Sequence, residues 1–184
     1  MNFQSICGVI LSGGGSTRIG QDKAWLKYKG KYLIAHQINL LEYFFKNLVI
    51  STNNNSLKQF GYTVIHDEFL ETGPIGGIHA VIKNTNFDYY YFLAVDLPCI
   101  TQSIIDDIIN NSAKGNIVIP KHGKFIEPLC GIYHRKILSR IEKTISRGNY
   151  KLMDIIKNEN TYFIEMNDRS ENFKNLNFMT DFEQ

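Results

Sequence analysis

The chain has 184 residues, of which 43% are hydrophobic and 21% charged, the proportions of a globular protein with a substantial core. Its formal net charge of +2 and the lack of a dense basic run in the sequence exclude a general nucleic-acid-binding protein. Three cysteines without a CxxC pair, and a first apolar run too short for an export signal or a membrane span, predict a single cytoplasmic domain over residues 1–184 with neither nucleic-acid nor membrane partners.

The first half of the chain alternates predicted strands with predicted helices. An apolar run at 6–11 ends in three glycines, which is typical of a buried strand that leads into a tight turn. The longest apolar run, 89–95, indicates a central parallel strand that is buried on both faces. The same patterns predict a loop at 17–30, strands at 48–50 and 63–65, a glycine-rich loop at 73–77, and helices at 31–46, 57–60, 78–83 and 102–111.

The second half predicts a strand at 117–120, a turn at 122–124 and a returning strand at 125–133 that Glu127-Pro128 breaks. Helices are predicted at 136–146 and 152–157, and a last strand at 161–164. The whole pattern indicates an α/β fold with three layers, Rossmann-like, whose mainly parallel sheet has right-handed crossovers. The segment 120–133 is predicted to be an inserted antiparallel ribbon.

Polar residues follow four of the predicted strands directly. They are the segments 12–15 and 51–53, with Asp67 and Asp96. In open parallel sheets ligands bind outside the carboxyl ends of the strands. We therefore predict the functional site at this edge of the sheet.

The glycine-rich turn after the first strand predicts a site for a polyanion. Glycines let a ligand approach backbone N–H groups closely, and Arg18 and Lys23 add two cations nearby. The Walker motif is excluded, because Gln21-Asp22 replace its Lys-Ser/Thr, and the dinucleotide motif is excluded, because Arg18 replaces its third glycine. A nucleoside triphosphate is the simplest ligand for this turn.

This segment resembles the opening of the molybdenum cofactor guanylyltransferases, the MobA family of the wider nucleotidyltransferase group. The matching residues of its motif are Leu11, Gly13, Gly14, Ser16, Arg18, Ile19, Gly20, Asp22 and Lys23. Later matches extend the resemblance over nearly the whole chain: Asp67, Gly73-Pro74 with Gly77, Asp96-x-Pro98, and Glu127-Pro128-Leu129-x-Gly131-x-Tyr133.

The resemblance implies a nucleotide-diphospho-sugar-transferase-like fold and an enzyme that transfers GMP from GTP to molybdopterin, with release of pyrophosphate. It implies Mg²⁺ as cofactor, and molybdoenzymes or cofactor-delivery proteins as further partners. A related transferase that uses CTP or a sugar-phosphate acceptor stays open. So does a GTP-binding or cofactor-carrier module without catalytic activity.

The resemblance also implies roles for individual residues. Arg18 and Lys23 would neutralise the phosphates and the departing pyrophosphate, and Asp96 would be the metal ligand and the third catalytic residue. Ser51 and Ser12 depart from the family, which more often has Asn and Ala at these two positions. The implied nucleotide-binding residues are Leu11, Ser12, Gly13, Gly14, Gly15, Lys23, Ser51, Asn53, Asp67, Gly77 and Asp96.

The acceptor is expected in the second half of the chain, where the family binds it. Asn175 and Asn177 resemble the family's Asn-x-Asn, although Phe178-Met179 replace the usual Thr-Pro. The expected acceptor contacts are Lys124, Glu127, Arg147, Lys151, Asn175 and Asn177.

Overall fold

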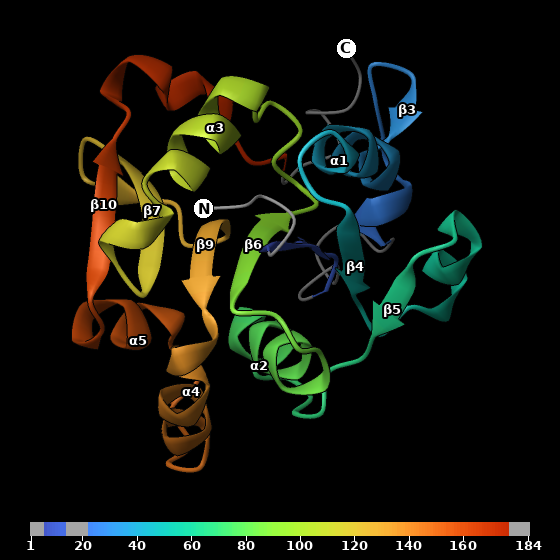
Figure 1. The fold of residues 1–184 in the computed structure, drawn as a ribbon. Helices are drawn as coiled ribbons and strands as arrows, with labels where there is room; N and C mark the ends of the chain where they lie inside the picture. The colour runs from blue at the N-terminus through green and yellow to red at the C-terminus, as the bar shows by residue number, and fades with distance from the viewer. Residues whose placement is uncertain (1–5, 14–21, 177–184) are drawn as a thin grey trace.

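The computed structural model describes residues 6–13 and 22–176 (Figure 1). Its main sheet has eight strands, in the order β10-β7-β9-β6-β1-β4-β5, with β8 paired to β7. These strands are β1 (Ile6–Leu11), β4 (Asn47–Ser51), β5 (Thr63–Ile65), β6 (Tyr89–Ala94), β7 (Ile117–His122), β8 (Phe125–Ile126), β9 (Cys130–His134) and β10 (Thr161–Glu165).

The sheet is mainly parallel, as predicted. The strand β1 pairs in parallel with β4 and β6, β4 with β5, and β7 with β10. The strand β9 is antiparallel to both β6 and β7. The returning strand of the predicted antiparallel ribbon is therefore a strand of the main sheet. Its predicted break is also present, because β8 and β9 both pair with β7 and residues 127–129 bulge out between them. There Glu127 N donates to Pro120 O over 3.0 Å.

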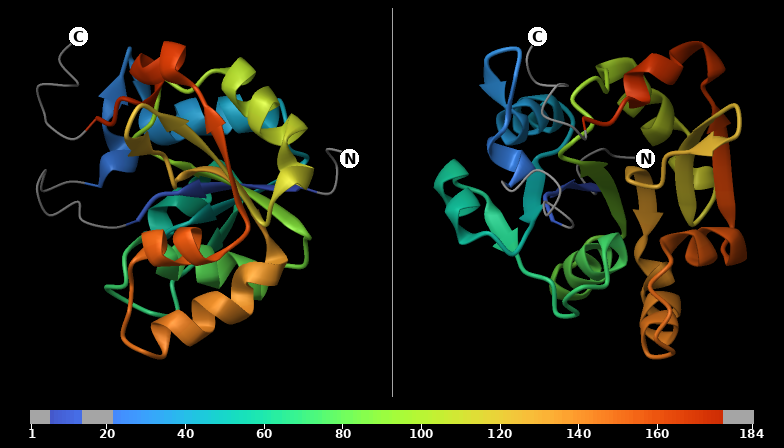
Figure 2. Two further views of the ribbon diagram at one scale, coloured as in Figure 1. Left: turned by 90° about the vertical axis from the view of Figure 1, so that its left-hand side faces the viewer. Right: turned by 180° about the vertical axis from the view of Figure 1, so that it is seen from behind.

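Helices cover both faces of this sheet (Figures 1 and 2). The side chains of α1 (Leu33–Glu42) and α3 (Gln102–Asn110) form one hydrophobic cluster with one face of the sheet. The side chains of α2 (Pro74–Asn84), α4 (Leu138–Ile145) and α5 (Leu152–Asn158) form a second cluster with the other face. The three-layer prediction is therefore confirmed. None of the helices in the described ranges is long and apolar enough to cross a membrane.

Several element boundaries differ from the predictions; α1, for example, ends at Glu42 rather than at residue 46. Two of the differences have clear local reasons. The predicted helix 31–46 begins at Leu33, because β2 (Lys27–Tyr28) and β3 (Lys31–Tyr32) form a hairpin. Its turn residues Lys29 and Gly30 both have positive φ, +48° and +78°, as a type I′ turn requires. The predicted loop 73–77 is mostly the first turn of α2, which has a proline at its first position, where the missing N–H costs no hydrogen bond.

The strand register brings several strand ends to one edge of the sheet. Leu11 is opposite Ser51 on β4 and Ala94 on β6, and Ser51 is opposite Ile65 on β5. Because these strands are parallel and end together, the residues that follow them meet at the same edge. Asp67 and Asp96 thus lie at the same edge as Ser12 and Gly13, which follow β1.

Candidate active site

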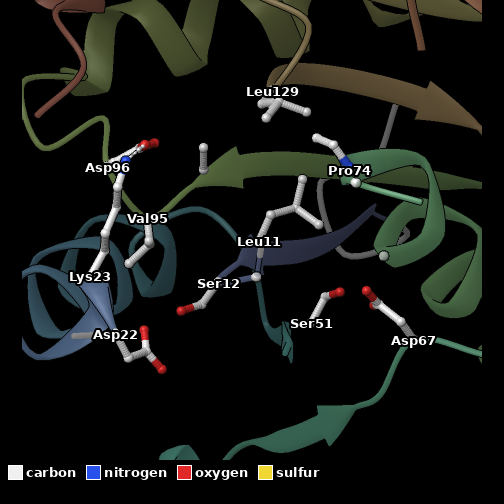
Figure 3. A pocket seen from close by; sticks show the side chains of 14 residues that line it. Leu11, Ser12, Asp22, Lys23, Ser51, Asp67, Pro74, Val95, Asp96 and Leu129 are labelled. Atoms are coloured by element: carbon white, nitrogen blue, oxygen red, sulfur yellow. Dashed lines mark hydrogen bonds and ion pairs between the residues drawn. The ribbon is translucent and has the colours of Figure 1, made fainter. Parts of the chain in front are cut away.

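A pocket of about 290 Å³ opens at this edge of the sheet (Figure 3). Predicted site residues that line it are Leu11, Ser12, Gly13, Lys23, Ser51, Asp67, Gly77 and Asp96. Four further lining residues, Asp22, Gly73, Pro74 and Leu129, belong to the motifs matched in the sequence, and the last two, Ala94 and Val95, were not predicted. Predicted residues Gly14, Gly15, Arg18 and Asn177 lie outside the described residues.

The floor of the pocket is the end of β1, which hydrogen bonds fix on both sides. Ser12 N donates to Ser51 O over 2.9 Å, and Val95 N donates to Leu11 O over 3.0 Å. The Ser12 side chain is only 4% exposed, and its hydroxyl has no hydrogen-bond partner among the described residues. A buried hydroxyl without a partner costs free energy unless a ligand or water pairs with it. Ser12 thus offers a polar contact to whatever fills the pocket.

An ion pair forms the charged end of the pocket. Lys23 Nζ lies 2.7 Å from Asp96 Oδ2, and the two side chains are 19% and 20% exposed. Lys23 opens the 3-10 helix η3 (Lys23–Trp25), while Asp96 follows β6. The structure therefore joins an ammonium group and a carboxylate that are 73 positions apart in the sequence.

The turn that carries Asp96 is held from behind by Gln37. This buried α1 side chain places Nε2 3.3 Å from Ala94 O, 3.4 Å from Val95 O and 2.9 Å from Leu97 O. The sequence analysis missed Gln37. The available signal is a polar residue on the apolar face of a helix, since a buried polar side chain needs hydrogen-bond partners.

The segment that carries Lys23 is held by two side-chain contacts of Asp22. Asp22 Oδ1 accepts from Ala24 N over 3.0 Å, which makes Asp22 the N-cap of η3. Its Oδ2 accepts from Asn54 Nδ2 over 2.6 Å, and Asn54 follows β4. Asn54 is a second positioning residue that the sequence analysis missed.

The opposite wall of the pocket is formed by Asp67, Ser51 and the start of α2. A Cβ added to Gly77 would lie 2.7 Å from Ser51 Oγ and 3.5 Å from Asp67 Oδ1. Only glycine lets α2 approach the strand ends this closely. Burial raises the pKa of the Asp67 carboxyl, and the nearby His66 lowers it in part. The structure brings Asp67 to this wall with a carboxylate that can accept hydrogen bonds from a ligand.

Asn53 does not line the pocket. Its Oδ1 accepts from Asp67 N over 3.0 Å, so its side chain holds the backbone of Asp67 in place. A nucleotide contact by Asn53 stays a prediction, and the geometry supports a positioning role.

The expected acceptor residues are spread over several elements and none of those described lines the pocket. Asn175 lies near it, because the next residue, Leu176, donates from N to Asp96 O over 3.1 Å. Glu127 lies 2.8 Å from His122 Nε2 through Oε1. Burial and the charge of Asp96 raise the pKa of the Glu127 carboxyl, and His122 lowers it in part.

The other three predicted acceptor residues are exposed. Lys124 is in the turn between β7 and β8, and Arg147 and Lys151 are in the connection from α4 to α5. The structure does not bring these three residues to the pocket, and their contacts with an acceptor stay predictions.

The pocket can hold a metal only together with ligand atoms. No group of three or more His, Cys, Asp or Glu side chains suited to a metal ion exists within residues 6–13 and 22–176. Mg²⁺ in nucleotide sites uses one or two carboxylates and completes its shell with phosphate oxygens and water. The partly exposed Asp96 carboxylate fits this kind of site, provided that Lys23 moves to the phosphates.

Comparison with known proteins is consistent with this arrangement. Residues 8–162 match the family model of the MobA-like NTP transferase domain. A molybdenum cofactor guanylyltransferase from Syntrophotalea carbinolica is 34% identical over 185 aligned positions, covering 96% of this chain and 88% of that protein.

Two solved structures show the same fold. Molybdopterin-guanine dinucleotide biosynthesis protein A from Archaeoglobus fulgidus has a TM-score of 0.80 at 23% identity, covering 96% of this chain and 95% of that one. The 2-C-methyl-D-erythritol 4-phosphate cytidylyltransferase from Thermus thermophilus has a TM-score of 0.72 at 9% identity, covering 95% and 94%. The predicted nucleotide-diphospho-sugar-transferase-like fold is confirmed. The fold alone does not indicate which nucleobase the donor nucleotide carries.

Proposed function

We propose that this chain, a nucleotidyltransferase that belongs to the MobA-like NTP transferase family, transfers GMP from GTP to molybdopterin and releases pyrophosphate. We further propose that residues 1–184 act as one nucleotidyltransferase domain. The observation that carries the proposal is the pocket that gathers Lys23, Asp67 and Asp96 at the ends of parallel strands. Full-length similarity to a protein named molybdenum cofactor guanylyltransferase supports the choice of substrates.

The proposed reaction needs alignment and charge compensation rather than a protein nucleophile. A phosphate oxygen of the acceptor attacks the α-phosphorus of GTP, the new P–O bond forms, and the bond to the β-phosphate breaks. The electron pair of that bond leaves with pyrophosphate. Because the acceptor oxygen is already anionic, the protein has to bring two anions together and stabilise the charge that develops on the leaving group.

Among the described residues that line the pocket, Lys23 carries the positive charge that can stabilise the leaving group. In the proposal its ammonium leaves Asp96 and contacts the phosphates of GTP. Backbone N–H groups at the glycine-rich turn and Arg18, which lies outside the described residues, contribute further positive potential. Asp96 would hold Mg²⁺, which would supply charge neutralisation and orientation of the phosphates.

Asp67 favours guanine over cytosine in this proposal. Guanine presents two neighbouring N–H donors on its Watson–Crick edge, which a carboxylate can accept together. Cytosine presents one amino group beside two acceptors, so it would leave a carboxylate oxygen unpaired. This difference supports GTP over CTP as the donor nucleotide.

The direct test is incubation with GTP, Mg²⁺ and molybdopterin, followed by chromatography of the dinucleotide and an assay of pyrophosphate. The same assay with CTP, ATP and UTP distinguishes a guanylyltransferase from a cytidylyltransferase. Lys23→Ala and Asp96→Ala should each lower turnover by roughly a hundredfold or more. Lys121→Ala, which removes a surface lysine paired with Glu165, is the matched control and should keep normal turnover.

The outcomes of this assay distinguish the proposed function from its two alternatives. GTP binding without pyrophosphate release would favour the carrier module, and a product from CTP would favour the related cytidylyltransferase. Normal turnover in both active-site variants would place the reaction outside this pocket.

A further inference from the structure

The Lys23–Asp96 ion pair lies in the active-site pocket, where a ligand can reach both of its members. Both residues line the pocket, and about a fifth of each side chain is exposed. The 2.7 Å between Lys23 Nζ and Asp96 Oδ2 makes this contact a charge-assisted hydrogen bond. The ammonium of Lys23 therefore occupies one oxygen of the carboxylate to which the proposed function assigns a metal ion.

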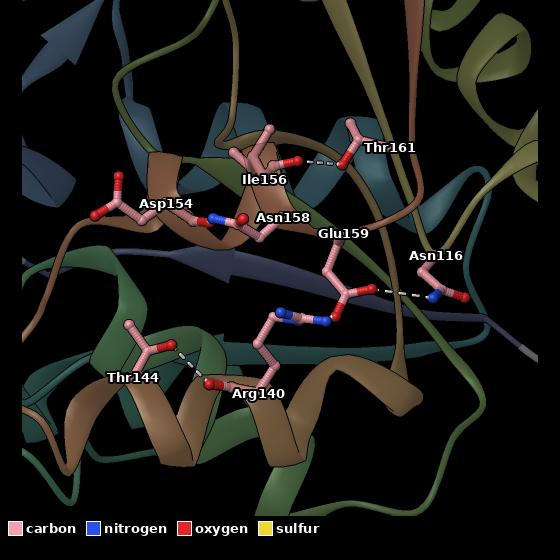
Figure 4. A network of polar contacts seen from close by, with 8 residues as sticks. All are labelled: Asn116, Arg140, Thr144, Asp154, Ile156, Asn158, Glu159 and Thr161. Carbon is pink, nitrogen blue, oxygen red and sulfur yellow. Dashed lines mark hydrogen bonds and ion pairs between the residues drawn. The ribbon is translucent and has the colours of Figure 1, made fainter.

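An ion pair elsewhere in the protein shows a purely structural arrangement for comparison (Figure 4). Glu159, which follows α5, accepts from Arg140 Nε through Oε1 and from Asn116 Nδ2 through Oε2, the latter over 3.2 Å. Protein donors thus pair with both carboxylate oxygens, and none of these three residues lines the active-site pocket. The Lys23–Asp96 pair differs because it borders the pocket, so its hydrogen bond can be exchanged for bonds to a ligand.

Asp96 is the fixed member of the pair. Leu176 N donates to Asp96 O over 3.1 Å, and Gln37 Nε2 donates to the carbonyls on either side of Asp96, over 3.4 and 2.9 Å. Lys23 instead carries its charge at the end of a flexible four-carbon stem. Rotation of the Lys23 side chain is therefore the smallest movement that uncovers the carboxylate.

The described lining of the pocket contains more acids than cations. Within residues 6–13 and 22–176, the carboxylates that line it belong to Asp22, Asp67 and Asp96, and the cation that lines it is Lys23. A surface of this kind raises the local concentration of divalent cations. The Lys23 ammonium competes with them at Asp96, because two cations on one carboxylate lie close together and repel each other.

We propose that Lys23 is the resident counter-cation of Asp96 and keeps free divalent metal ions off this carboxylate until a nucleotide binds. The triphosphate draws the ammonium away, which exposes Asp96, and phosphate oxygens provide the remaining ligands that Mg²⁺ needs. Metal and nucleotide then bind with positive cooperativity, and each raises the affinity of the other by the same factor. The inference rests on the proposed function, from which it takes the nucleotide site and the metal-binding role of Asp96.

Mn²⁺, which prefers oxygen ligands as Mg²⁺ does, is the probe that tests this proposal. It is titrated into the full chain without nucleotide at constant neutral pH, and paramagnetic broadening of the backbone amide signals of Val95 and Leu97 reports its binding beside Asp96. Lys23→Met keeps a side chain of similar length without the charge, and it should bind Mn²⁺ there about tenfold to a hundredfold more tightly than wild type. Adding Asp96→Asn to Lys23→Met should remove this gain.

Lys121→Met is the matched control, because it removes a surface lysine that pairs with Glu165. It should leave the broadening beside Asp96 as in wild type. A GTP analogue with a methylene group between the α- and β-phosphorus atoms cannot release pyrophosphate in the proposed reaction. At saturation this analogue should tighten Mn²⁺ binding in wild type, and it should do so by a smaller factor in Lys23→Met, where no ammonium has to leave Asp96.

The proposal is wrong if wild type and Lys23→Met bind Mn²⁺ equally without nucleotide, or if Lys121→Met shows the same gain. A gain that survives Asp96→Asn would also overturn it, because the ion would then bind elsewhere. Circular dichroism and thermal melts confirm that each variant is folded. An analogue that does not bind would contradict the proposed function instead, while the comparison without nucleotide still decides whether Lys23 keeps the metal ion off Asp96.

Discussion

Replacing Gly77 with alanine tests how tightly α2 is packed against the strand ends. The added Cβ would lie 2.7 Å from Ser51 Oγ and 3.2 Å from Leu11 Cδ2, so side chains or the helix must shift. Overpacking of this kind costs about 1–3 kcal/mol. Alanine in place of a helical glycine returns about 1 kcal/mol. The expected net loss in the free energy of unfolding is therefore about 1 kcal/mol.

Ser51→Ala separates the two contributions, because it removes the Oγ atom that the new methyl group meets. In that background the next nearest atoms to the added Cβ are Leu11 Cδ2 and Asp67 Oδ1, at 3.2 and 3.5 Å. Gly77→Ala should then be neutral or stabilising by up to about 1 kcal/mol. The double-mutant cycle should give a coupling of about 1–2 kcal/mol between the two sites.

Urea denaturation of the four proteins of the cycle measures these differences. Gly13→Ala is the matched control, because none of the described residues lies within 4 Å of its added Cβ, and its stability should stay within about 0.5 kcal/mol of wild type. Equal stabilisation by Gly77→Ala in the wild-type and Ser51→Ala backgrounds would show that the added methyl group does not clash with Ser51 Oγ. A matching loss of GTP affinity in Gly77→Ala is expected, because the same shift moves one wall of the proposed nucleotide pocket.

Three further substitutions test the parts around the pocket. Burial raises the pKa of the Asp67 carboxyl in the folded protein, so the folded state binds a proton at this group more tightly than the unfolded chain does. At neutral pH, where the carboxyl is ionised in the unfolded chain, this group therefore lowers the free energy of unfolding. Asp67→Asn should therefore raise the urea midpoint at pH 7. This increase in midpoint should shrink as the pH falls below the pKa of an aspartate in the unfolded chain, and an increase that stays the same there would contradict the prediction. Gln37→Leu removes the side-chain donor to Ala94 O and Leu97 O, which keep their backbone donors Leu97 N and Ile100 N. It should cost about 0.5–1.5 kcal/mol and reduce pyrophosphate release, with the exposed Gln59→Leu as control. Asp22→Ala removes the cap of η3 and should cost about 0.5–2 kcal/mol and raise the KM for the nucleotide through Lys23, whereas an unchanged KM would argue against that positioning role.

The strand ends were predictable because a parallel sheet constrains them strongly. Ser51, Asp67 and Asp96 each follow an apolar run in the sequence, and the register of β1, β4, β5 and β6 aligns these runs at one edge. Hydrophobic periodicity locates the strands, and topology then assembles the polar residues without further information. The same reasoning predicted the break at Glu127-Pro128, because proline cannot donate to a neighbouring strand.

The residues that hold the site in place were not predictable in this way. Gln37 and Asn54 contact residues 57 to 60 and 32 positions away, respectively, and no local pattern specifies these partners. Asn53 shows the related difficulty, since its position after β4 suggests a ligand contact, but its side chain bonds to the Asp67 backbone instead. Tertiary contacts decide whether a polar residue at a strand end faces the ligand or the protein.

The Lys23–Asp96 ion pair lets the pocket keep a cation and an anion close together in the absence of substrates. Each side chain is about four-fifths buried, and a partly buried charge without a partner is costly. In the proposed reaction the ammonium of Lys23 contacts the triphosphate, and the Asp96 carboxylate would hold Mg²⁺, so each group of the ion pair gains a ligand of opposite charge. Lys23→Ala and Asp96→Ala each remove one side of this partly buried ion pair, so both variants are expected to affect stability as well as turnover. Loss of activity in either variant supports the proposed roles only when the folded fraction is measured in the same sample.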